Sequence, residues 1–88
     1  MIRRRVAIHG WVQGVFFRDA VLRRARTANV SGWVRNNRDG TVEAVFEGDP
    51  GAVERLVAFC QEGPRGAEVD RVDVAAEDPE GLSGFEIR

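Results

Sequence analysis

The residue types of an anion-binding turn occur together in one short segment, Gln13-Gly14-Val15-Phe16-Phe17-Arg18. Glycine lets the backbone bend and approach a ligand without a Cβ in the way. Where such a bend opens a helix, the first backbone N–H groups have no partner within the helix, and the helix dipole favours an anion beside them. Arg18 adds a planar, permanently charged guanidinium that matches two phosphate oxygens. An ordinary strand-to-helix turn with a surface arginine explains the same residues, so the segment alone leaves both interpretations open.

Asn36 is the second residue of chemical interest, because it lies at the end of an expected strand and beside the turn at residues 37–40. Its amide oxygen can accept a hydrogen bond from a water molecule and so orient it. In a turn, the same amide often bonds to its own backbone instead. Without further context, the sequence supports either role.

The chain has one histidine, His9, and one cysteine, Cys60. Strand alternation places His9 on the face opposite Val6 and Ile8, so we expect a half-exposed histidine rather than a nucleophile. Cys60 falls on the apolar stripe of an expected helix, where packing is its expected role. A single cysteine forms no intrachain disulfide, which fits a reducing compartment. One histidine and one cysteine are too few for a typical zinc site, so we expect none.

Periodicity in the apolar residues predicts the elements that position these side chains. Alternate residues are apolar where strands are expected, and every third or fourth residue is apolar where helices are expected. An Asp-Gly turn at residues 39–40 joins two of the strands, and broken alternation near Arg71 predicts a β-bulge. The expected elements, in order, are a strand over 5–12, a helix over 19–28, strands over 30–34 and 42–46, a helix from Asp49-Pro50 to Gly63-Pro64, and strands over 69–74 and 85–88.

This order is β-α-β-β-α-β with a short extra C-terminal strand. It predicts an α+β fold, the ferredoxin-like sandwich, in which two helices cover one face of an antiparallel sheet. The length of 88 residues suits a single domain over residues 1–88. The fold itself does not identify a function, since it occurs in enzymes, RNA binders and regulatory modules.

The charge balance argues against two classes of partner. Thirteen basic residues, all of them arginine, oppose fourteen acidic ones, for a net charge of −1. General affinity for nucleic acid or an anionic membrane needs an excess of positive charge, so we expect neither partner. No apolar stretch approaches the ~20 residues of a membrane span. The basic N-terminus is not followed by the apolar run of a signal peptide, so we expect a cytoplasmic location.

Two separated motifs resemble the signatures of the acylphosphatase family. Residues 10–18 match every fixed position of the pattern G-x-V-Q-G-V-x-F-R, and residues 32–42 fit G-W-V-R-N-x-x-x-G-x-V. The ending, residues 81–88, is also similar to the usual C-terminus of that family. Trp11 stands where the family usually has arginine, and Phe16 occupies a variable position.

The resemblance implies a ferredoxin-like enzyme that hydrolyses acyl phosphates to a carboxylate and inorganic phosphate, without metal or cofactor. By resemblance, Arg18 binds the phosphate together with the loop, Asn36 holds the attacking water, and the protein is a monomer. The substrate-binding loop consists of Gln13, Gly14, Val15, Phe16, Phe17 and Arg18.

Two other function classes stay open. RNA-binding domains share this order of elements, but they present aromatic side chains on the central strands and a basic surface. Here Trp11 lies at the end of a strand, and Phe46 falls on the alternating positions expected to face the core, so neither is placed like the aromatic residues of those domains. The other class is a binding or regulatory domain that keeps the loop without turnover. Whether Trp11 and Trp33 pack on the helix-free sheet face or flank a substrate is undecided at this level.

Overall fold

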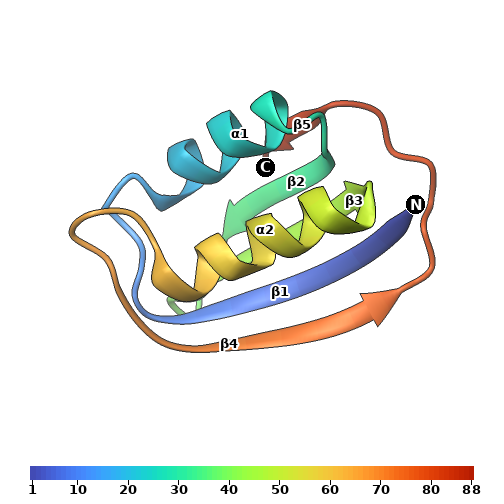
Figure 1. Ribbon diagram of the computed structural model, residues 1–88. Coiled ribbons are helices and arrows are strands. Elements are labelled where there is room, and N and C mark those ends of the chain that lie inside the picture. Colours follow the sequence, from blue (N-terminus) through green and yellow to red (C-terminus); the bar gives the residue numbers. More distant parts are fainter.

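The computed structural model describes all residues from Met1 to Arg88. Both helices lie over the same face of a five-stranded sheet, whose strand order is β4-β1-β3-β2-β5 (Figure 1). The elements are β1 (Ile2–Trp11), α1 (Phe17–Thr27), β2 (Ser31–Asn36), β3 (Val42–Gly48), α2 (Pro50–Glu62), β4 (Glu68–Glu77) and β5 (Phe85–Ile87).

The strand pairings confirm the predicted ferredoxin-like fold class and add one feature to it. Strand β1 is antiparallel to both β3 and β4, and β2 is antiparallel to β3. The short β5 runs parallel to β2, so the sheet is mixed. Figure 1 shows the reason: after β4, the chain crosses to the opposite edge of the sheet and enters beside β2 in the same direction.

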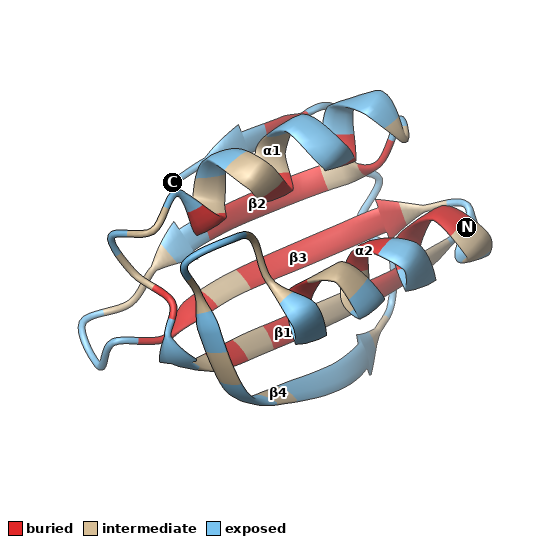
Figure 2. Cartoon of the chain, turned by 60° about the vertical axis from the view of Figure 1, so that its left-hand side comes forward, coloured by how far each residue is buried: buried red, intermediate tan, exposed pale blue.

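The core lies between the helices and the three central strands (Figure 2). Alternate residues of the strands point toward the helices, as the period of two requires. Phe46 of β3 is fully buried and stacks on Phe85 of β5 with ring centroids 5.9 Å apart. The larger buried side chains of this cluster are Val6, Ile8, Val34, Val42 and Phe46 from the strands, and Phe17, Val21, Val53, Leu56 and Cys60 from the helices.

Charged residues extend β1 and β4 beyond the predicted ranges. β1 begins at Ile2 and includes Arg3 and Arg5, whose guanidiniums pair with acidic side chains on the neighbouring strands. Hydrophobic periodicity does not reveal a strand that is stabilised by ion pairs, and the predicted start at residue 5 was therefore too late.

The predicted bulge is present, because the register shifts so that His9 pairs with Arg71 and Gly10 with Val69. A Cβ on Gly10 would collide with the carbonyl oxygen of Glu68 across this bulge.

The two helices begin in different ways. Helix α2 starts as predicted, with the Asp49 carboxylate accepting a hydrogen bond from the Ala52 N–H at 3.3 Å and Pro50 in the first turn. Helix α1 starts at Phe17, earlier than the predicted Asp19, and no side chain caps it. The residue at its N-cap is Phe16, in the left-handed backbone region.

A buried carboxylate holds the segment that leads to β5. Glu47 of β3 lies 2.7 Å from the guanidinium of Arg3 and accepts hydrogen bonds from the backbone N–H groups of Glu80, Gly81 and Leu82 at 2.8–3.1 Å. Burial disfavours the charged form. The hydrogen bonds from the Glu80 backbone and from Arg3 outweigh this effect and hold the pKa of Glu47 below its usual value.

We expect Glu47→Ala to lower the free energy of unfolding by about 3–5 kcal/mol, because it leaves Arg3 with less compensation and three N–H groups without an acceptor. Urea denaturation measures this change. The matched control is Glu86→Ala, whose exposed carboxylate pairs only with Arg88 and whose loss should cost less than about 1 kcal/mol.

The same contact gives a pH readout. A carboxylate whose pKa is lower when folded stabilises the protein above the unfolded pKa, and this stabilisation is lost as the pH falls below about 4.3. In Glu47→Gln, the acid-dependent loss should be smaller than in the parent. The assigned role would be contradicted if Glu47→Gln lost stability at low pH as the parent does and Glu47→Ala were as stable as the parent.

Candidate active site

The turn between β1 and α1 presents a row of free backbone donors. Gly14 and Phe16 both have positive φ, 76° and 60°, which bends the chain sharply before the helix. The first backbone hydrogen bond of α1 runs from the Ala20 N–H to the Phe16 carbonyl at 3.0 Å. No protein atom accepts from the N–H groups of residues 13–19. Successive unpaired N–H groups at a helix N-terminus form a site suited to an anion.

Arg18 and Asn36 line one cleft of about 290 Å³ at this turn. Arg18 belongs to the first turn of α1, and Asn36 is the last residue of β2. Asn36 follows the buried Val34 by two residues, so strand alternation carries it to the helix-covered face of the sheet. The cleft is lined by Val12, Gly14, Phe16, Phe17, Arg18, Asp19, Asn36 and Ile87.

The guanidinium of Arg18 has no acidic partner. Its neighbour Asp19 pairs instead with Arg23 one turn further along α1, at 3.1 Å. Most other arginines near the sheet are neutralised by glutamates; Arg5, for example, contacts both Glu43 and Glu77. The partly buried Arg18 therefore supplies an uncompensated positive charge next to the free N–H groups.

Asn36 makes no side-chain hydrogen bond, and its Oδ1 is the one buried side-chain oxygen or nitrogen without a partner. Leaving such a group unsatisfied costs about 1–3 kcal/mol. A half-turn of the amide about its last torsion exchanges the places of Oδ1 and Nδ2, so either an acceptor or a donor can face the cleft. Asn36 therefore does not act as a turn residue bonded to its own backbone.

Two of the predicted loop residues do not line the cleft. The amide group of Gln13 donates to the backbone carbonyls of Asn37 and Thr41, at 2.8 and 2.9 Å. Its side chain thereby ties the turn to the β2–β3 hairpin, a role that the sequence analysis did not foresee. Val15 is partly buried and packs against the core. Gly14, Phe16, Phe17 and Arg18 do line the cleft.

The remaining candidate residues lie outside the cleft. His9 is half-exposed on the helix-free face and lies 2.9 Å from Asp73. Cys60 is fully buried, as expected, and burial raises the pKa of its thiol to about 12. Trp33 is buried on the helix-free face beneath three guanidiniums, those of Arg5, Arg35 and Arg88 at 4.9–5.4 Å. Trp11 is exposed and is not part of the cleft lining.

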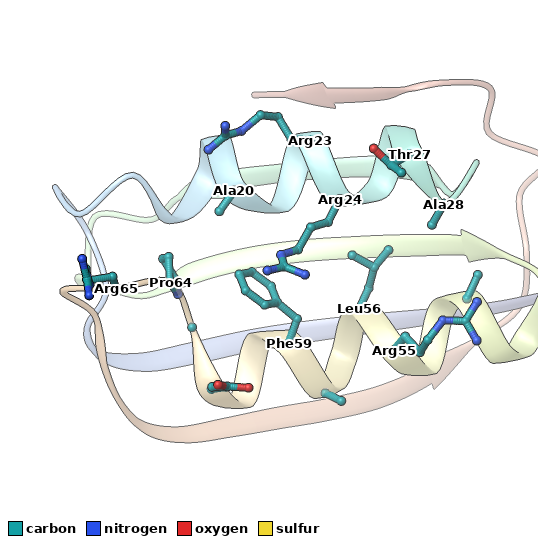
Figure 3. Close-up of a pocket in the computed structure, with 14 residues that line it drawn as sticks. Ala20, Arg23, Arg24, Thr27, Ala28, Arg55, Leu56, Phe59, Pro64 and Arg65 are labelled. Atoms are coloured by element: carbon teal, nitrogen blue, oxygen red, sulfur yellow. The ribbon is translucent and has the colours of Figure 1, made fainter.

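A larger groove of about 990 Å³ runs between α1 and α2 (Figure 3). The guanidinium of Arg24 crosses it and lies 3.9 Å above the ring of Phe59. Figure 3 shows that Arg23, Arg55 and Arg65 do not point toward a common centre. The groove contains none of the residues singled out by sequence, and the smaller cleft is the candidate active site.

Nowhere do three or more histidine, cysteine, aspartate or glutamate side chains gather in a way that could hold a metal ion. Neither helix has the length and apolar character needed to cross a membrane.

Fold and turn together define a ferredoxin-like sandwich whose first strand is followed by a turn of unpaired backbone N–H groups. The model of the acylphosphatase family matches residues 4–87, and the chain belongs to this family. The acylphosphatase of Rubrobacter xylanophilus is 56% identical over 98% of this chain and 79% of its own length. That of Thermococcus kodakarensis is 54% identical over 98% of this chain and 94% of its own.

A solved structure agrees with these sequence relatives. The crystal structure of acylphosphatase from Bacillus subtilis superposes with a TM-score of 0.95 at 34% identity. The match covers 100% of this chain and 99% of that one. The resemblance first noted in two motifs therefore extends to the whole fold.

We expect Gln13→Ala to lower the free energy of unfolding by about 1–3 kcal/mol, because two carbonyl groups lose a donor. Urea denaturation measures this change. Gln13→Glu keeps the length of the side chain but sets a carboxylate against two carbonyl oxygens, so it should destabilise more than alanine does. Equal stabilities for the parent and both variants would remove the assigned tether.

Proposed function

We propose that this chain hydrolyses acyl phosphates to a carboxylate and inorganic phosphate through attack of water at phosphorus. The observation that carries the proposal is the cleft itself. It brings an uncompensated arginine and free backbone donors together with an asparagine whose amide has no partner. The names of the relatives support the same substrate class.

The leaving group of an acyl phosphate needs little assistance from the protein. A carboxylate leaves with a conjugate-acid pKa of about 4, comparable to a side-chain carboxyl, so it needs no general acid. Phosphoryl transfer proceeds through a loose transition state in which positioning and charge stabilisation supply most of the acceleration. In the proposed mechanism, the backbone N–H groups and Arg18 stabilise the charge on the equatorial phosphate oxygens, and no metal is required.

Asn36 orients the nucleophile in this proposal. An amide takes up no proton near neutral pH, but its oxygen accepts one hydrogen bond from water and directs the water oxygen toward phosphorus. The bond from water oxygen to phosphorus forms as the bond from phosphorus to the acyl oxygen breaks. The proton of the water passes to a phosphate oxygen of the substrate itself, and the acyl oxygen leaves as a carboxylate.

We expect Arg18→Ala to lower kcat/KM for benzoyl phosphate by at least 10²–10³-fold, the typical effect of removing one preorganised donor. Inhibition by inorganic phosphate should weaken in parallel, because the guanidinium binds the ground state too. Arg18→Lys is the matched variant, because it keeps the charge but loses the two-pronged geometry of the guanidinium. Its kcat/KM should lie between that of the parent and that of Arg18→Ala. Spectrophotometric hydrolysis measures all three. Near-normal activity in Arg18→Ala would overturn the proposal.

We expect Asn36→Ala to lower kcat by about 10²-fold while the inhibition constant of phosphate stays close to that of the parent. Its free energy of unfolding should stay equal or rise, because the alanine removes a buried oxygen that has no donor. Kinetics and urea denaturation on the same preparation give both quantities.

The neighbouring Asn37 provides the opposite control. Its side chain donates to Thr41 and Glu43 and accepts from Arg35, at 3.1–3.2 Å. Asn37→Ala should therefore lose stability and keep its kcat. An Asn36→Ala variant that is less stable than Asn37→Ala but fully active would make Asn36 a structural residue.

A further inference from the structure

The cleft has a polar side and an apolar side. Arg18, Asn36 and the free N–H groups form the polar side. Val12 and Phe17 are buried beneath the floor, so the exposed apolar surface comes from two side chains, Phe16 and Ile87. These two belong to the few large hydrophobic residues that the molecule leaves exposed, at 83% and 41%.

Phe16 has a conformation that core packing does not explain. Its φ of 60° and ψ of 24° lie in the left-handed region, which bulky residues rarely adopt. Glycine or asparagine would occupy this position with less strain. The Phe16 side chain is not part of the buried core or of the residues packed against it. Strained residues of this kind are found preferentially at ligand sites.

Ile87 approaches the same cleft from the other end of the sequence. β5 is fixed beside β2 by the pairing of Ile87 with Val34 and by a hydrogen bond from the Arg88 N–H to the Val34 carbonyl at 2.9 Å. Phe85, two residues earlier, is buried in the core. Strand alternation therefore directs Ile87 to the helix-covered face, toward the start of α1.

We propose that the side chains of Phe16 and Ile87 form the surface against which the acyl group of the substrate packs. The cleft then selects acyl phosphates with an apolar or aromatic acyl group over those with a small or polar one. This inference rests on the proposed function. When the phosphate binds to Arg18 and the N–H groups, the acyl group lies one bridging oxygen away and meets the apolar lining that remains. Contact with that lining removes apolar area of both partners from water.

The test compares two substrates, benzoyl phosphate and acetyl phosphate, in the parent, Phe16→Gly and Ile87→Ala. Glycine adopts the left-handed conformation freely, so Phe16→Gly removes the side chain without requiring a new backbone geometry. The ratio of kcat/KM for benzoyl phosphate to that for acetyl phosphate should fall about tenfold in each variant, the lower end of the range for lost apolar contacts in a binding site. The inhibition constant of inorganic phosphate should change little, because phosphate contacts the polar side alone.

The control is Val74→Ala, which truncates an exposed hydrophobic residue on β4, at the other edge of the sheet. Its substrate ratio should equal that of the parent. The outcomes separate the two proposals. A parent that hydrolyses neither substrate refutes the proposed function and the acyl surface together. If the parent hydrolyses both substrates and the ratio is unchanged in both variants, the acyl surface alone is refuted. The same holds if kcat/KM for both substrates and the affinity for phosphate fall equally in the variants.

Discussion

The backbone N–H groups of residues 13–19 have no acceptor within the chain, and the arrangement of the candidate active site depends on keeping them unpaired. A serine, threonine, aspartate or asparagine at the start of α1 would accept from these donors and close the site. The protein uses such a cap on α2, where Asp49 binds the Ala52 N–H. On α1 the N-cap residue is Phe16, which offers no acceptor. The chain thus caps one helix start with a side chain and leaves the donors of the other without an acceptor.

An open turn of this kind needs external support, which comes from side chains remote in sequence. Gln13 ties the turn to the hairpin that follows Asn36, so the N–H groups and the amide of Asn36 share one framework. The pairing of the charged side chains also leaves this turn positive. On the helix-free face, arginines pair with glutamates or lie over Trp33, whereas Arg18 is left unpaired. A net charge of −1 therefore coexists with a locally positive cleft.

Features with a local signal were predictable from sequence. The Asp49-Pro50 helix start, the bulge near Arg71 and the burial of Cys60 each depend on residues close together in the chain, and all three are present. The start of β1 was not predictable, because ion pairs replace hydrophobic periodicity there. The tether from Gln13 and the position of Phe16 and Ile87 along one cleft both involve distant segments, and no local pattern predicts them.

The two sides of the cleft are held by separate parts of the molecule. The polar side depends on the first turn and its tether to the hairpin. The apolar side depends on β5, which has three residues and relies on its neighbours for stability. Phe85 anchors β5 in the core, and Glu47 at the far end of β3 fixes the backbone of residues 80–82 that leads into it. Because Glu47 does this through its charged form beside Arg3, an ion pair at the far end of β3 supports the segment that leads to Ile87. If Phe16 and Ile87 contact the acyl group as proposed, changes in the segment between β4 and β5 act on acyl selectivity through Ile87, while Arg18 and the turn keep their own separate supports.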